Sequence, residues 1–145
     1  MRAVESAFAS KLKLLGFRRR GRTWWRMSEF AIQVINVQRG FGEQAHVNLG
    51  VYVRSFGEAS APKENHCHVR ARLERVSDRE YFESIRRLDV CSAPLPQALD
   101  ALMTCGVPWL DSLSTRAGLC AFLEKRDSSH VFVHKFARDL CNRGA

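Results

Sequence analysis

The feature that most constrains the fold is a change in the spacing of apolar residues along the chain. Between Gln44 and Arg54 apolar side chains alternate with polar or small ones, a period of two that is typical of a β-strand with one buried side. Before Gly16 and after Val76 the period becomes 3.6, which is typical of amphipathic helices. The pattern therefore predicts an α+β fold: an N-terminal helix, an antiparallel meander of about five strands, and several C-terminal helices packed on one sheet face.

The first helix is predicted from Val4, Phe8 and Leu12, which share one helical face, and Gly16 is expected to end it. Gly21 then separates an Arg-rich stretch from a Trp-rich one, which predicts a tight hairpin of two short strands. Three longer strands are expected at residues 30–38, 44–54 and 66–75.

Helices are predicted after the sheet. Ser77 and Glu80 have the spacing of a capping box, and Gly106 is expected to end a helix that begins at Leu95. The expected helical segments are 77–88, 95–105, a turn from Pro108, 115–125 and 128–141. Neither a repeat nor a linker interrupts the 145 residues, so we expect one globular domain over residues 1–145.

The positive charge is concentrated at the start of the chain. The net charge is +8, and residues 1–26 carry eight basic residues against one acid, which is +7 of that excess. A clustered basic patch attracts phosphates or acidic proteins. The alternative is that these side chains only deter pairing at the edge of the sheet.

Cysteine use indicates a reducing compartment. The five cysteines are an odd number without a CxxC pair, which does not suit a disulfide framework. Cys105, Cys120 and Cys141 fall at apolar positions of predicted helices, where we expect them to act as small hydrophobic residues. With neither a secretory signal nor a membrane span in the sequence, we expect a cytoplasmic location.

The candidate binding residues come from the basic hairpin and from the polar face of the sheet. If Asn36 pairs opposite His46, then Ile35 and Val47 lie together on the buried face and polar side chains collect on the other. The candidates are Arg18, Arg20, Arg22, Trp25, Asn36, Gln38, His46, Asn48, Tyr52, His68, Arg70 and Arg72.

We expect neither a cofactor, a metal site nor a recognised catalytic set. His66 and His68 would share a strand face while Cys67 points away, so the three cannot chelate one metal ion. The sequence has no GxSxG elbow, HExxH helix or Gly-rich phosphate loop. An enzyme of unrecognised class that uses the polar face remains an alternative.

Several motifs resemble those of a known family. The strings LKLLGFRRRGRTWWR, IQVINVQRG, HVNLGVYV, CHVRARL and VPWLDSLST resemble the bacterial domain-of-unknown-function family 4304, over about Leu12 to Leu123. Shared features are an opening GF-x-+-x-G-x-x-W/Y-x-R, a central IN-x-Q, an NLGV strand and a PWL turn, whereas Gly40 stands where the family tends to have Ser. The resemblance implies a single α+β domain and supplies no activity or cofactor.

The sequence favours a protein-binding domain, with an acidic protein surface as the expected partner. One form of this is a bacterial immunity protein that docks on a toxin or effector, by analogy with other small bacterial domains. The alternative is a nucleic-acid or phosphate-ligand binding module, because Arg side chains around Trp24 and Trp25 could stack bases and neutralise phosphates. Adjacent strand residues point to opposite faces, so these two tryptophans cannot both face solvent.

Overall fold

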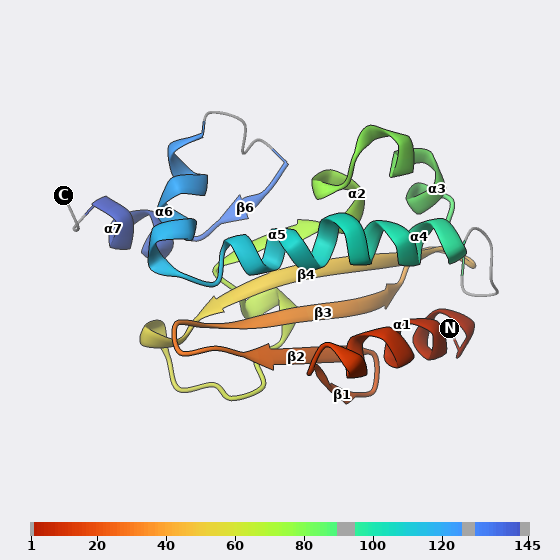
Figure 1. Cartoon of the computed structure of the whole chain (residues 1–145), viewed down its shortest axis with the longest axis horizontal. Coiled ribbons are helices and arrows are strands. Elements are labelled where there is room, and N and C mark those ends of the chain that lie inside the picture. Colours follow the sequence, from red (N-terminus) through yellow and green to blue (C-terminus); the bar gives the residue numbers. More distant parts are fainter. Residues whose placement is uncertain (1, 90–94, 126–129, 143–145) are drawn as a thin grey trace.

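The strands of the sheet follow one another in the order of the sequence, and each pairs antiparallel with the next (Figure 1). This computed structural model describes residues 2–89, 95–125 and 130–142. Within them the predicted α+β class is confirmed, and a sixth strand extends the expected meander. The strands are β1 (Arg18–Arg20), β2 (Thr23–Met27), β3 (Ala31–Arg39), β4 (Ala45–Val53), β5 (Val69–Arg72) and β6 (Phe132–Val133).

Helices cover one face of this sheet. Helix α1 and the α4–α5 segment cross the same side of the strands (Figure 1). The described α-helices are α1 (Arg2–Leu14), α2 (Leu73–Val76), α3 (Phe82–Arg86), α4 (Leu95–Ala101), α5 (Val107–Ser112), α6 (Arg116–Glu124) and α7 (Lys135–Asn142). The main core lies between α1, α4–α5 and the sheet, where Phe8, Leu49 and Leu110 are fully buried. We call this side of the sheet the covered face.

The N-terminal helix ends where the sequence predicts. Gly16 has φ +89°, a left-handed conformation that glycine adopts without steric cost. The Phe17 N–H then donates to the Leu12 carbonyl at 3.0 Å, which closes the helix end and turns Phe17 into the core. Gly21, at φ +62°, forms the expected hairpin turn between β1 and β2.

The register of β3 and β4 differs from the predicted one by two residues. Asn36 lies opposite Asn48, and His46 lies opposite Gln38. Because side chains alternate with a period of two, a shift by two leaves each on its predicted face. Ile35 and Val47 are therefore both buried on the covered face.

The prediction that a helix ends at Gly106 is wrong. Helix α4 continues through a π-helical turn, η4 (Leu102–Gly106), into α5. A Cβ at Gly106 would lie only 2.8 Å from Leu73 Cδ1, so glycine here permits close packing rather than a stop. Pro108 lacks an N–H for the preceding turn, and the wider π turn accommodates that loss.

The predicted strand at 66–75 and the capping box after it are both corrected. Only Val69–Arg72 is strand, and α2 begins at Leu73. The Ser77 hydroxyl donates to the Leu73 carbonyl at 2.6 Å and so ends α2 instead of capping a new helix. A 3-10 turn at Arg79–Tyr81 precedes α3.

The C-terminal segment also differs from the single predicted helix at 128–141. Phe132 and Val133 form β6, which pairs with Arg70 and Val69 at the edge of the sheet, and α7 follows. A two-residue strand leaves almost no alternation in the sequence, so the pattern could not reveal it.

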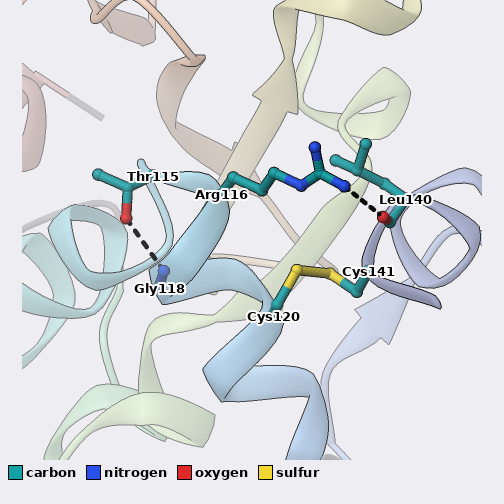
Figure 2. The surroundings of a disulfide bond; sticks show 6 residues. All are labelled: Thr115, Arg116, Gly118, Cys120, Leu140 and Cys141. Atoms are coloured by element: carbon teal, nitrogen blue, oxygen red, sulfur yellow. Dashed lines mark hydrogen bonds between the residues drawn. A yellow bond between two sulfur atoms is a disulfide. The ribbon is translucent and has the colours of Figure 1, made fainter. Parts of the chain in front are cut away.

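Cys120 and Cys141 form a disulfide between α6 and α7 (Figure 2), contrary to the expectation of free thiols. The packing of α6 on α7 brings their Cα atoms to 5.3 Å, within the range that a disulfide requires. Arg116 Nη2 also donates to the Leu140 carbonyl at 3.2 Å (Figure 2). Cys67 and Cys105 are free, and Cys91 lies outside the described residues.

Candidate functional site

The sheet face opposite the covered face, here called the second face, is closed over only part of its area. The segment at residues 54–68 folds across the half that carries Trp25, Ile32 and Tyr52. The Trp25 indole N–H donates to the Pro62 carbonyl at 2.8 Å, which fastens the segment to β2. The result is a small second core made of Trp25, Ile32, Val34, Tyr52 and Cys67.

The other half of the second face carries a row of hydrogen-bonded polar side chains, here called the amide ladder. Asn48 Nδ2 donates to Gln38 Oε1 at 3.0 Å and to Asn36 Oδ1 at 3.3 Å. Asn36 Nδ2 donates in turn to Thr23 Oγ1 at 2.9 Å and to the Arg22 carbonyl at 3.3 Å. Both asparagines thus use both amide hydrogens within the ladder, which fixes their orientation.

A groove of about 540 Å³ lies along the ladder, and we call it the amide groove. Its charged lining side chains are Arg20, Lys63, Arg70 and Glu64, so cations outnumber carboxylates by three to one. Glu64 is committed to Arg70 through contacts of 3.0 and 3.3 Å. The full lining is Arg20, Thr23, Trp25, Asn36, Gln38, Asn48, Ala61, Lys63, Glu64, Asn65 and Arg70.

Six of the predicted binding residues therefore meet in one place: Arg20, Trp25, Asn36, Gln38, Asn48 and Arg70. His46 and Arg72 line a neighbouring hollow of about 310 Å³ on the same face. The sequence interpretation missed Thr23, Lys63, Glu64 and Asn65. Three of these come from the loop after β4, whose path across the sheet leaves no periodic signal; Pro62 marks it only as irregular.

Tyr52, His68 and Trp25 are not open binding side chains as expected. Tyr52 is 8% exposed and Trp25 9%, because the segment at residues 54–68 covers them. His68, at the end of that segment, is 7% exposed and packs against the rings of Tyr52, Phe56 and His134. Asn48 lines the groove but is also only 7% exposed. His68 Nδ1 accepts the Val53 N–H at 2.9 Å. Burial, together with the neighbouring His134, lowers the pKa of His68 to about 4, so this imidazole is neutral at pH 7.

The basic hairpin does not form one patch, because β1 alternates between the two faces. Arg18 and Arg20 lie on the second face, whereas Arg19 lies on the other. Arg19 contacts Glu5 at 3.2 Å and lies 5.3 Å from the centre of the Trp24 ring. Arg22 is 3.9 Å from the same carboxylate, a weak contact at an exposed turn.

Arg26, the last arginine of the basic run, has a structural role. Its guanidinium donates to Gln33 Oε1 at 2.8 Å, to the Leu15 carbonyl at 3.0 Å and to Asp111. Gln33 Nε2 donates to Asp111 and to Ser114 Oγ at 2.8 and 2.9 Å. This network joins β2 and β3 to the end of α5.

The Cys67 thiol on the second face is not an activated nucleophile. The Cys67 thiol is held neutral because burial, with Glu64 nearby, raises its pKa, and its Sγ lies 3.7 Å from the Lys63 carbonyl. Among residues 2–89, 95–125 and 130–142, no group of three or more His, Cys, Asp or Glu side chains is placed to hold a metal ion. The groove thus presents fixed hydrogen-bonding groups and cations, without an activated nucleophile of the kinds considered above.

Comparisons with known proteins place the chain in a family. The search of curated proteins and the search of solved structures found no match. A helix long and apolar enough to cross a membrane is not found among the described residues. The family model for a domain of unknown function, DUF4304, matches residues 8–111. This span contains β1–β5 and ends before α6, β6 and α7. The match covers well over half of the sequence, and the chain therefore belongs to the DUF4304 family.

Proposed function

We propose that this chain is a binding domain that docks an acidic protein surface in the amide groove. One form of this function is immunity, in which the bound protein is a toxin or effector whose working surface becomes covered. The observation that carries the proposal is the combination of a preset amide ladder with three cations and one carboxylate in one groove.

Preorganisation supports recognition at this groove. Asn36 and Asn48 are held by hydrogen bonds before a partner arrives, so binding costs little additional side-chain entropy there. Arg20 is exposed on β1. Within the described part of the chain, its side chain forms no ion pair and no hydrogen bond. It is therefore available to a carboxylate, with which a guanidinium forms two parallel hydrogen bonds.

A protein partner fits this groove better than single-stranded nucleic acid. Modules that bind single strands stack bases on exposed aromatic rings. Trp24 is in the main core and Trp25 is beneath the segment at residues 54–68, so neither ring offers its face to a base. The remaining cations suit complementary charge across a protein interface, which raises association rate and specificity.

The experiment begins with capture of partners from the native host on the purified full chain. The captured acidic protein is then purified, and its affinity is measured by calorimetry against wild type, Arg20→Glu and Lys63→Glu. We expect each charge reversal to weaken binding at least about tenfold, which is ~1.4 kcal/mol. Arg79→Glu is the matched control, because Arg79 is exposed on the 3-10 turn before α3 and does not line the groove.

Two results would overturn the proposal. One is equal affinity of the partner for wild type and both groove variants. The other is tight binding of single-stranded nucleic acid with a steep salt dependence that Arg20→Ala flattens, because that would make the groove a nucleic-acid site. A toxin gene next to the gene for this chain would favour the immunity form.

A further inference from the structure

A second cluster of arginines surrounds the hollow beside the amide groove, where β4 begins and β5 ends. We call it the arginine hollow. It measures about 310 Å³. Its lining is Gln44, His46, Arg72, Glu74, Arg75, Phe82 and Arg86. Three arginines thus face one carboxylate across a small volume.

Two cations of the arginine hollow, Arg75 and Arg86, stack on one aromatic ring. The guanidinium carbons of Arg75 and Arg86 lie 5.4 and 5.6 Å from the centre of the same ring, that of Phe82. Stacking on one aromatic ring restricts both long side chains and keeps their N–H groups near the hollow. Arg86 also contacts Glu83 at 3.6 Å, but both side chains are more than half exposed, so the pair is weak.

Backbone contacts fix the two walls of the hollow relative to each other. The Ala45 N–H donates to the Leu88 carbonyl at 3.0 Å, and Gln44 forms an antiparallel bridge with Asp89. These contacts fasten the segment that follows α3 to the start of β4. Arg72, at the end of β5, pairs in register with Asn48, so the second wall is part of the sheet itself.

His46 completes the hollow as a neutral hydrogen-bonding group. Burial and the nearby Arg72 lower the pKa of His46, and Glu74 opposes them only in part. The imidazole packs directly against the backbone at Gly40, where an added Cβ would lie 2.7 Å from Nε2. Glycine at position 40 therefore gives this ring its position.

We propose that the arginine hollow binds a phosphate monoester or free phosphate through Arg72, Arg75 and Arg86, with His46 beside the anion. A phosphoryl group carries up to two negative charges and three strong acceptor oxygens, and the planar donors of arginine match them. A bound dianion also relieves the repulsion among guanidinium groups that Glu74 alone does not balance. The site is separate from the amide groove and does not depend on the proposed function.

In the first arm of the test, the 145-residue chain is titrated with inorganic phosphate and the histidine side chains are monitored by NMR. The charged groups that line the hollow with His46 are Arg72 from β5, Glu74 and Arg75 from α2, and Arg86 from α3, and of these Arg72 and Glu74 affect its pKa directly. Added phosphate should bind saturably and raise the pKa of His46, since a nearby anion favours the imidazolium. His130 is exposed and outside this lining, so its side-chain resonances should not respond to added phosphate.

The second arm compares variants and sources of the phosphoryl group. Arg72→Gln and Arg75→Gln should each weaken phosphate binding at least fivefold, and Arg79→Gln, the matched control, should not. Gly40→Ala should displace the imidazole and reduce the phosphate-induced change in the pKa of His46 while the arginines remain.

A phosphoserine peptide that binds more tightly than inorganic phosphate, together with an unphosphorylated peptide that does not bind, would show that the phosphoryl group belongs to a modified protein. Tighter binding of free phosphate would assign it to a small molecule.

The proposal is overturned if phosphate leaves the pKa of His46 unchanged, if binding does not saturate, or if Arg79→Gln weakens it as much as Arg72→Gln. Because Arg72, Arg75 and Arg79 are exposed, the spectra of these variants should show the native fold. If the unmodified chain does not bind phosphate but still captures its protein partner, this site alone is rejected. If the unmodified chain binds phosphate but captures no acidic protein, only the proposed function is rejected.

Discussion

Trp24 and Trp25 are adjacent in β2 and lie on opposite faces of the sheet, and different parts of the chain cover them. Trp24 packs with Phe8 of α1 in a core that also involves α4 and α5. Trp25 packs in a cluster of five residues under the single segment at residues 54–68. Beyond that segment the second face carries the amide ladder and is open.

This difference separates the residues that hold the fold together from those available to bind. The covered face is apolar along β3 and β4 except for Arg39, which is exposed at the end of β3, and Gln33, which is hydrogen-bonded to Arg26, Asp111 and Ser114. The second face becomes polar where its cover ends. These polar side chains line the amide groove, which is where we propose that the partner binds.

The largest expected effect is on the covered face. Trp24→Ala removes a side chain that is 1% exposed, and we expect a loss of about 3–5 kcal/mol in the free energy of unfolding. Trp24 Nε1 has no hydrogen-bond partner in the described part of the chain, so Trp24→Phe should cost much less. Urea denaturation measures both. Equal losses for the two variants would contradict this account of the core.

The next effect concerns the C-terminal helices, which lie outside the family match. The Cys120–Cys141 disulfide closes a loop with a sequence separation of 21, so its removal by Cys120→Ser with Cys141→Ser should cost about 3 kcal/mol. Hydrogen exchange should rise in α6, β6 and α7 before it rises in β2–β4. Cys105→Ser is the control, because Cys105 is a free thiol. Uniform exchange across the whole chain would show that α6–α7 is not a separate unit.

A smaller effect is expected where one segment provides the cover. Trp25→Ala should cost about 2 kcal/mol, less than Trp24→Ala, because the segment at residues 54–68 can close on the space that remains. The loss of the hydrogen bond to Pro62 should increase proteolytic cleavage between residues 54 and 68. If Trp25→Ala lowers the free energy of unfolding as much as Trp24→Ala, the small second core contributes as much to stability as the main core, which would contradict this comparison.

The cover of the second face also makes stability depend on pH. The pKa of His68 falls from 6.5 to about 4 on folding, so the unfolded chain binds more protons between these values. Stability should therefore decrease as the pH falls from 6.5 towards 4, as protonation of Nδ1 also breaks its hydrogen bond with the Val53 N–H. His68→Phe should be less stable at pH 7 and should lose this part of the pH slope. An unchanged slope, measured by urea denaturation at each pH, would contradict the assignment.

The smallest effect on stability is expected in the amide ladder. Asn48→Ala removes two hydrogen bonds of a side chain that is 7% exposed but lines the groove, where water can replace the lost donor, so we expect a loss of about 1 kcal/mol. Thermal denaturation provides the measurement. A loss as large as that of Trp25→Ala would mean that the ladder is a structural network.

Much of the fold could be predicted from the periods of the apolar residues. Alternation identified β4, and the helical period of Val4, Phe8 and Leu12 identified α1, because each element buries one side. The predicted sheet face of each polar residue in β3 and β4 is also correct, because the predicted register differs from the observed one by two residues, an even number. Gly106 was misread because a glycine that allows close packing resembles, in sequence, one that ends a helix.

The candidate site could be predicted only in part. Asn36, Gln38 and Asn48 follow from alternation, and the structure brings them together. The burial of Trp25, Tyr52 and His68 depends on the path of an irregular segment, which no periodicity encodes. The Cys120–Cys141 disulfide was missed for the same reason, since it depends on how α6 packs on α7.

The most direct test of the central claim measures stability and binding on the same groove variant. Arg20→Glu should change the free energy of unfolding by less than about 0.5 kcal/mol, because Arg20 is exposed on an edge strand. The same variant should lose at least about tenfold in affinity for the purified acidic partner. A large loss of stability with unchanged affinity would contradict the claim that the open half of the second face serves binding.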